Sequence, residues 1–226
     1  MSNRQLIKTK DNSSTIFVPG LNQHYHSIHG AVQESQHVFI EAGFGLKDVL
    51  DEIKVFELGF GTGLNALMTQ NEAIKKNIKC QYWTVEKYPL KEEEYSKLNY
   101  PEIFNSEGKN EQFTKLHQCV WDQPVALNPL FELHKIKGDV KKLKLKENYF
   151  DLIYFDAFAP SSQADLWTIE IFTKMFNCLK DEGVLVTYCV KGEVRRNMIE
   201  AGFEVEKIPG PPGKREMARA FAIKSK

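Results

Sequence analysis

The chain has 226 residues, of which 42% are hydrophobic, so it can bury one sizeable core and nothing in it requires a second domain. Thirty basic and thirty acidic residues give a formal net charge of zero, which excludes a protein that binds a polyanion by bulk charge alone. The cysteines form no C-x-x-C pair, and no signal segment or membrane-length apolar run is present. We therefore expect a single domain over residues 1–226 in the reducing cytoplasm.

The first 50 residues are predicted to form a strand and then a segment that covers a ligand site. The run STIFVPG is typical of an edge strand ended by Pro19 and Gly20. Histidine density in the next 24 residues favours either a metal site or a polar cover, and without a nearby cysteine or an H-E-x-x-H spacing we expect the cover and no metal. Tyr25 and Ser27 are the candidates for reaching a ligand. The histidines concerned are His24, His26, His29 and His37.

The stretch VFELGFGTGLNAL predicts an apolar strand, a tight turn and the start of a helix. Gly59, Gly61 and Gly63 leave the backbone open to a ligand, and the helix start offers unpaired N–H groups. This pattern predicts a nucleotide-type ligand site. The spacing is G-x-G-x-G rather than the dinucleotide fingerprint G-x-G-x-x-G, and Glu57 precedes it inside the strand. A carboxylate at Glu57 suits a cationic ligand better than a pyrophosphate.

The motif E-x-G-x-G-x-G, from Glu57 to Gly63, resembles the first motif of the class I S-adenosylmethionine methyltransferases. The ligand of that class carries an amino group and a sulfonium. The resemblance implies that S-adenosylmethionine is the cofactor and that Thr62 and Asn65 belong to its site. The alternation of strands and helices favours the same fold, an α/β Rossmann-like domain whose seven-stranded sheet ends in an antiparallel strand.

Acidic residues follow two of the predicted strands. Glu86 ends the strand CQYWTVEK, 23 positions after Gly63, and is placed to accept hydrogen bonds from ribose hydroxyls, with Lys87 beside it. The alternative is a solvated carboxylate at a strand end. Asp139 ends the strand LHKIKGDV, and in this fold class it faces the adenine amino group while Val140 contacts the base.

The strand FDLIYF is followed by Asp156 and an aromatic-proline loop. Open α/β sheets bind ligands outside the carboxyl ends of their strands, so we expect Asp156, Phe158 and Pro160 where the transferred methyl group emerges. Asp156 as the cap of the next turn is the alternative. We predict that Asp156 positions the group that receives the methyl, and whether it also accepts a proton from that group stays open.

The remaining elements frame this site. Residues 100–130 are longer than a plain connection needs and predict a helical insertion that is either a substrate cap or a lid. Asp165 is predicted to cap the helix that follows it. The segment PGPPGKREM joins the last two predicted strands. The candidate substrate contacts among basic residues are Lys191, Arg195, Arg196, Lys214 and Arg215.

Five segments together resemble the tRNA 5-methylaminomethyl-2-thiouridine methyltransferases: HYHSIHGAVQESQHVFIEAG, ELGFGTGLNAL, YFDAFAP with Trp167 shortly after it, LVTYCVKGEVRR and PGPPGKREM. The resemblance implies methyl transfer to the aminomethyl nitrogen of a wobble uridine, with tRNA as partner and Tyr25, Phe158, Pro160 and Trp167 at the substrate. Because the chain ends at Lys226, we expect a stand-alone enzyme that needs another enzyme to supply the aminomethyl-uridine.

Three other functions fit parts of the pattern. A methyl- or aminopropyl-transferase acting on a small amine would have a similar fold and a similar aspartate. A nicotinamide-dependent oxidoreductase is disfavoured by Glu57 and the glycine spacing. A non-catalytic tRNA-binding module is disfavoured by acids at successive strand ends.

Overall fold

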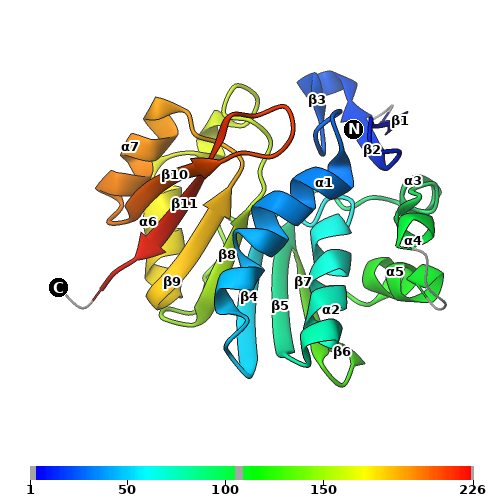
Figure 1. Cartoon of the computed structure of the whole chain (residues 1–226), viewed down its shortest axis with the longest axis horizontal. Coiled ribbons are helices and arrows are strands. Elements are labelled where there is room, and N and C mark those ends of the chain that lie inside the picture. Colours follow the sequence, from blue (N-terminus) through cyan, green and yellow to red (C-terminus); the bar gives the residue numbers. More distant parts are fainter. Residues whose placement is uncertain (1–3, 105–108, 225–226) are drawn as a thin grey trace.

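The computed structural model of the protein describes residues 4–104 and 109–224. Its centre is an eight-stranded sheet with the strand order β10-β11-β9-β8-β4-β5-β7-β6 (Figure 1). The strands are β4 (Glu52–Leu58), β5 (Lys79–Glu86), β6 (Pro124–Asn128), β7 (Phe131–Lys137), β8 (Phe150–Phe155), β9 (Leu179–Thr187), β10 (Glu204–Pro209) and β11 (Glu216–Ala222).

Strand direction follows the predicted fold class. β4 pairs in parallel with β5 and β8, while β7 and β9 extend the parallel pairing outward. The last strand, β11, is antiparallel to both of its neighbours, as expected. The predicted count of seven is one too low, because β6 adds an antiparallel strand to the outer edge of β7.

The extra strand lies in the region predicted to be a helical insertion. Within residues 100–130 the described part of the chain forms α4 (Tyr100–Ile103), α5 (Lys109–Gln118) and then β6. Residues 105–108 of the predicted insertion lie outside the described residues. The outer edge of β7 offers unpaired backbone groups, and pairing with β6 satisfies them.

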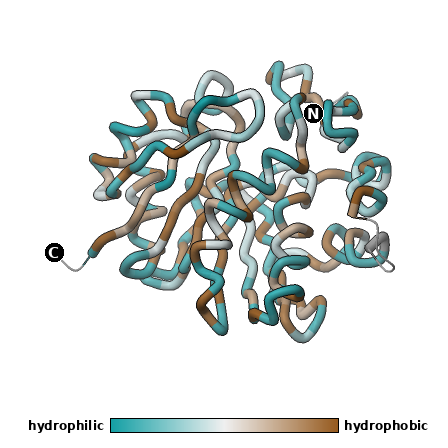
Figure 2. The backbone as a smooth tube through the Cα atoms, in the orientation of Figure 1, coloured by the Kyte–Doolittle hydropathy of each residue, from teal (hydrophilic) through white to brown (hydrophobic). Residues whose placement is uncertain are grey.

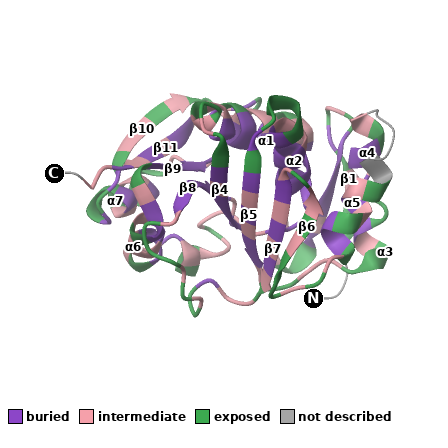
Figure 3. Cartoon of the chain, turned by 90° about the horizontal axis from the view of Figure 1, so that it is seen from below, coloured by how far each residue is buried: buried purple, intermediate pink, exposed green. Residues whose placement is uncertain are grey.

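Helices cover both faces of the sheet. One face carries α1 (Ala31–Ser35), the π-helical turn Gln36–Glu41 and α2 (Leu64–Lys76). The other face carries α6 (Ile169–Cys178) and α7 (Gly192–Glu200). Two apolar clusters result, one on each face, and the central strands β4 and β8 between them are largely buried (Figures 2 and 3).

A second, three-stranded sheet is built from β1 (Gln5–Lys8), β2 (Ser14–Val18) and β3 (Gln23–His24). The predicted edge strand is β2, and that prediction is wrong in one respect, because β2 is the central strand and pairs on both sides. This small sheet and the loop between β10 and β11 lie at the same end of the central sheet (Figure 1).

The start of α6 also differs from the prediction. Thr168 is the N-cap residue, and its hydroxyl accepts a hydrogen bond from the backbone N–H of Ile171. Asp165 lies earlier, in a short 3₁₀ turn (Ala164–Leu166), and pairs with Lys141. Thr168 lies three residues before Ile171, the first buried apolar residue of the helix, and it takes the cap position in place of the aspartate.

Candidate active site

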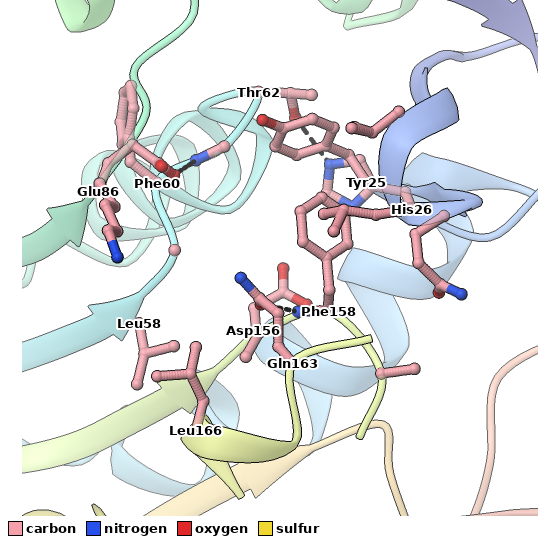
Figure 4. Close-up of a pocket in the computed structure, with 18 of the residues that line it drawn as sticks. Tyr25, His26, Leu58, Phe60, Thr62, Glu86, Asp156, Phe158, Gln163 and Leu166 are labelled. Carbon is pink, nitrogen blue, oxygen red and sulfur yellow. Dashed lines mark hydrogen bonds between the residues drawn. The ribbon is translucent and has the colours of Figure 1, made fainter. Parts of the chain in front are cut away.

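A cavity of about 450 Å³ opens at the carboxyl ends of β4, β5 and β8 (Figure 4). This size is in the range of small-molecule sites. Its wall combines the glycine turn, the ends of three strands, the loop after β8 and the N-terminal segment. The predicted site residues on this wall are Tyr25, Gly59, Gly61, Thr62, Asn65, Glu86, Lys87, Asp139, Val140, Asp156, Phe158 and Lys214.

Two glycines of the turn are required by close approach. Gly59 has φ +96°, and a Cβ there would lie 2.9 Å from the backbone oxygen of Asp156. Gly61 has φ +51°, and its Cβ would lie 2.8 Å from the ring of Tyr25. A side chain at either position would therefore push apart the glycine turn and the segments opposite it.

Thr62 fixes the glycine turn to three other segments. Its hydroxyl is 2.7 Å from Nε2 of His26 and accepts a hydrogen bond from the hydroxyl of Tyr100 at 3.3 Å. Its carbonyl oxygen is 3.1 Å from Nε2 of His117 in α5. Burial lowers the pKa of His26 to about 4, so the ring is neutral at pH 7. The insertion thus holds the glycine turn through Tyr100 and His117, and the N-terminal segment holds it through His26.

Glu86 stands beside the glycine turn. One carboxylate oxygen accepts a hydrogen bond from the backbone N–H of Gly61 at 3.1 Å, and the other accepts one from Tyr88 at 2.7 Å (Figure 4). Each oxygen has a further lone pair for a ligand hydroxyl. Glu86 thus stands at the end of β5 and on the cavity wall, where the sequence placed an acid.

Asp139 lies two residues beyond the end of β7. Burial opposes its charge, but hydrogen bonds from the backbone N–H of Lys141 and from Lys87 lower its pKa below the ordinary value. The Nζ of Lys87 is 3.0 Å from the carboxylate. Asp139 is thus ionised, and Lys87 and Lys141 already occupy part of its hydrogen-bonding capacity. Val140 supplies an apolar surface next to it.

Asp156 stands on the cavity wall directly after β8. The Nδ2 of Asn65 donates a hydrogen bond to its carboxylate at 2.8 Å. Burial and the nearby charge of Glu34 raise the pKa of Asp156 to about 7, while Asn65 and Lys214 oppose the rise. A carboxyl group with a pKa near 7 can both hold a cation and accept its proton at neutral pH.

Paired charges on the wall leave two acids without a cation. Three lysines pair with three acids, as Lys87 with Asp139, Lys141 with Asp165 and Lys214 with Glu34. Among the described residues of the wall, Glu86 and Asp156 are the acids that have no ion-pair partner. The cavity is therefore electrostatically suited to a ligand with positive charge.

Glu57 is not on the wall, although the sequence placed it at the ligand. Its side chain is fully buried inside β4, near Tyr82, Thr84 and Asn65. Burial and the charge of Asp156 raise its pKa well above the ordinary range. The physical reason is its position one residue before the end of the strand, so Leu58 lines the cavity instead. Gly63 is likewise off the wall, packed against His117.

Aromatic residues flank the opening. The rings of Tyr25 and Phe158 meet edge to face, with centroids 5.0 Å apart. Trp167, expected at the substrate, is buried and only 3% exposed, and its Nε1 donates a hydrogen bond to the carbonyl oxygen of Phe158 at 2.8 Å. Trp167 thus supports the loop from below. Pro160 belongs to the same loop but does not line the cavity.

The predicted basic contacts separate into two groups. Lys214 reaches the cavity wall. The other four lie outside it, on the loop after β9, on α7 and on the loop between β10 and β11, and among the described residues none of them has an ion-pair partner. They are Lys191, Arg195, Arg196 and Arg215. The pKa of Glu216 is lowered mainly by its hydrogen bond with Lys207, and the charges of Arg215 and Arg195 add to this, so α7 lies near the loop between β10 and β11.

Several wall residues were not predicted. Glu34, Gln163 and Tyr188 line the cavity. Tyr188 follows the strand β9, and the strand-end rule that identified Glu86 would have found it. Glu34 had a weaker signal, because it is the one acid of the short helix α1, whose sequence is AVQES.

The four histidines do not converge. His26 bonds Thr62, His29 packs on Gly213, and Nε2 of His37 is 2.8 Å from the carbonyl oxygen of Pro209. The ring of His24 packs against Phe17 in a tilted arrangement, with centroids 4.8 Å apart. Within residues 4–104 and 109–224, no three histidine, cysteine, aspartate or glutamate side chains are grouped so that they could hold a metal ion. In the same ranges, no helix is long and apolar enough to cross a membrane.

The fold and cavity together define a class of protein. A glycine turn after the first strand of the parallel sheet, acids at three strand ends and an antiparallel last strand are the features predicted for a Rossmann-like methyltransferase. The profile of a family described as S-adenosyl-L-methionine-dependent methyltransferase matches residues 110–223. The chain belongs to this family, and S-adenosylmethionine is its cofactor.

Individual relatives show which members of this family the chain resembles. The chain is 30% identical over 223 residues to the tRNA 5-methylaminomethyl-2-thiouridine biosynthesis bifunctional protein MnmC of Burkholderia multivorans, covering 90% of this chain and 33% of that protein. The MnmC of Pseudomonas entomophila is 31% identical over 208 residues, with coverage of 82% and 30%. The chain thus spans about a third of the length of these relatives. They confirm the resemblance inferred from the sequence.

A solved structure shares the fold. The crystal structure of MNMC2 from Aquifex aeolicus superposes with a TM-score of 0.80 at 22% identity, covering 98% of this chain and 71% of that one. This likeness confirms the α/β methyltransferase architecture.

Proposed function

We propose that the protein methylates the aminomethyl nitrogen of 5-aminomethyl-2-thiouridine at the wobble position of tRNA, which gives 5-methylaminomethyl-2-thiouridine. The observation that most supports this proposal is the pair of wall acids without a cation, Glu86 and Asp156. They suit a site that receives a sulfonium compound and an amine together. The names of the relatives in wobble-uridine biosynthesis support the same substrate.

The cofactor half of the cavity fits S-adenosylmethionine. We assign Glu86, with Lys87 beside it, to the ribose hydroxyls and Asp139 with Val140 to the adenine. Gly59, Gly61, Thr62 and Asn65 border the methionine portion. The carboxylate of Glu86 is already oriented by two backbone N–H groups, so little ordering is lost when the ligand binds. Bound S-adenosylmethionine supplies a methyl group on a positively charged sulfur, which passes to the amine nitrogen as the carbon–sulfur bond breaks and S-adenosylhomocysteine leaves.

We assign Asp156 to binding the acceptor amine and accepting its proton. An alkyl amine is mostly protonated at neutral pH and must lose a proton before its lone pair can attack. With a pKa of about 7, Asp156 binds the ammonium in its ionised form and accepts the proton far more readily than an ordinary aspartate. Asn65 fixes the carboxylate from the side of α2. Proximity and alignment supply most of the remaining rate.

The rest of the acceptor half would hold the nucleotide. We assign Tyr25 and Phe158 to the uracil ring, since aromatic faces stack on bases that leave the anticodon loop. Pro160 and Trp167 act through the backbone of that loop. We assign to tRNA phosphates four cations that have no ion-pair partner within the described part of the chain, namely Lys191, Arg195, Arg196 and Arg215. A tRNA substrate makes the cytoplasm the expected location, and a separate reaction must supply the aminomethyl-uridine.

The experiment is methyl transfer to defined tRNA. The purified protein is incubated with labelled S-adenosylmethionine and with tRNA whose wobble nucleoside is 5-aminomethyl-2-thiouridine, and digested nucleosides are analysed by mass. We expect 5-methylaminomethyl-2-thiouridine, and none with tRNA that carries unmodified uridine. Transfer of label to free alkyl amines but not to this tRNA would instead identify a small-molecule transferase.

A further inference from the structure

A cation site on the cavity wall is filled by the protein's own lysine. The Nζ of Lys214 is 2.6 Å from Oε1 of Glu34 and 3.9 Å from the centre of the Tyr188 ring. All three residues line the same cavity as Asp156. A carboxylate and an aromatic face are the two groups that bind an alkylammonium ion most readily in proteins.

Burial and a hydrogen bond hold the side chain of Glu34 in this position. It is 7% exposed, and its second oxygen, Oε2, accepts a hydrogen bond from the backbone N–H of Ser27 at 2.7 Å. A buried carboxylate without a cation is costly, so Lys214 compensates its charge. Lys214 comes from the loop between β10 and β11, which is 180 residues further along the chain.

The cation site is coupled to Asp156 through the surrounding structure. The hydroxyl of Tyr188 donates a hydrogen bond to the carbonyl oxygen of Ala157, the residue next to Asp156. The charges of Glu34 and Lys214 act on Asp156 in opposite directions. The other titratable groups that interact with Asp156 are Glu57 in β4, Tyr100 in α4 and Tyr188 after β9.

We propose that Glu34 is a second carboxylate of the acceptor-amine subsite, and that the substrate's alkylammonium replaces Lys214 beside Glu34 and Tyr188 when the nucleotide enters. The proposal rests on the proposed function and adds to it a way in which the site selects its substrate. A primary alkylammonium finds two acids, Glu34 and Asp156. A wobble side chain that ends in a carboxylate meets repulsion from both, so the subsite selects the aminomethyl form against forms that carry a carboxylate.

The first test measures the substrate's interaction with Glu34. Glu34→Gln keeps the shape and removes the charge, and Glu41→Gln removes an exposed acid from the same segment as a matched control. We expect Glu34→Gln to raise the KM for the aminomethyl tRNA about tenfold while the Kd for S-adenosylmethionine stays unchanged. It should also reduce the discrimination against an otherwise identical tRNA whose wobble side chain carries a carboxylate. Kinetics equal to those of Glu41→Gln would overturn the proposal.

The second test needs no tRNA. The carboxyl carbon of Asp156 is followed by NMR against pH in the wild type, in Glu34→Gln, in Lys214→Met and in the double variant, with Asp156→Asn to assign the signal. Loss of Glu34 should shift the titration of Asp156 down by about one pH unit, loss of Lys214 should shift it up, and the double variant should lie near the wild type. Because Lys214→Met tests the pair from the other side, the proposal stays testable if Glu34→Gln does not fold.

The two tests separate the two proposals. If the wild type transfers no methyl group to the aminomethyl tRNA, the proposed function is wrong, and the NMR titration still reports on the coupling of Glu34, Lys214 and Asp156. If transfer occurs but Asp156 titrates at the same pH in all four proteins, the subsite proposal is wrong and the proposed function stands.

Discussion

The two halves of the cavity are built in different ways. The cofactor half comes from β4, α2, β5 and β7, whose residues follow one another closely in sequence and meet because parallel strands end at one edge of the sheet. The acceptor half brings together the N-terminal segment, the loop after β8 and the loop between β10 and β11, joined by the ion pair of Glu34 with Lys214. The cofactor site is thus a local product of the fold, whereas the acceptor site depends on contacts between distant parts of the chain.

This difference predicts that variants of the two halves change different measured quantities. Changes in the cofactor half should alter the Kd for S-adenosylmethionine, and changes in the acceptor half should alter turnover or the KM for tRNA. Asp156 lies where the two halves meet.

The largest effect is expected at Asp156. Asp156→Ala removes the group that holds the amine and accepts its proton, so we expect kcat to fall about a thousandfold, or ~4 kcal/mol of transition-state stabilisation. The Kd for S-adenosylmethionine, measured by calorimetry, should change by less than about threefold. Turnover at the wild-type rate would remove Asp156 from the reaction.

A large effect on the cofactor is expected at the glycine turn. Gly59→Ala places a Cβ 2.9 Å from the backbone of Asp156 at a φ of +96°, and should weaken S-adenosylmethionine binding about a hundredfold. Gly20→Ala is the control, because nothing lies within 4 Å of its Cβ and it should bind like the wild type. Equal affinity of the two variants would contradict a cofactor site at this turn.

A smaller effect is expected at Glu86. Glu86→Gln replaces one acceptor oxygen with an amide, so the side chain can no longer hold two backbone N–H groups and the ribose together. We expect a Kd for S-adenosylmethionine about tenfold higher, or ~1.4 kcal/mol, with kcat at saturating cofactor nearly unchanged. A fall in kcat without a change in Kd would move Glu86 to the acceptor half.

The smallest effect concerns pH and stability. The pKa of Asp156 is raised in the folded protein from its ordinary 3.8 to about 7, so the fold favours the protonated form and loses this contribution as the pH rises from 3.8 through 7. Asp156→Asn should therefore raise the Tm by about 3 °C at pH 8 and have less effect at pH 4. Calorimetry at both pH values checks this, and an equal Tm change at both would contradict the raised pKa. In the wild type, kcat/KM should rise with pH through about 7 as Asp156 ionises.

The same contrast explains what the sequence could predict. Strand ends and glycine spacing are local patterns with one physical meaning. The sequence could therefore predict the parallel sheet, the glycine turn and the positions of Glu86, Asp139 and Asp156. Glu57 was expected at the ligand, but it lies one residue before the end of β4 and is fully buried, and the motif alone does not state where the strand ends. The extra strand β6 was missed because its pairing depends on the free edge of β7, which is known only once the sheet is built.

The acceptor half was harder to predict. Glu34 and Lys214 are 180 positions apart, and neither has a local signal that names the other. Trp167 was expected at the substrate, but its packing shows that it is buried beneath the loop after β8 and supports Phe158 through a backbone hydrogen bond. The basic residues were predicted as one group, and the structure separates Lys214, on the wall, from the four cations outside it.

The most direct measurement is a crystal structure of the protein with S-adenosylhomocysteine. We expect the ribose hydroxyls on Glu86, the adenine between Asp139 and Val140, and the sulfur directed toward Asp156, within about 6 Å of its carboxylate and open to the aromatic pair Tyr25 and Phe158. A ligand bound elsewhere, or one whose sulfur points away from Asp156, would contradict a single cavity in which the cofactor and acceptor halves meet.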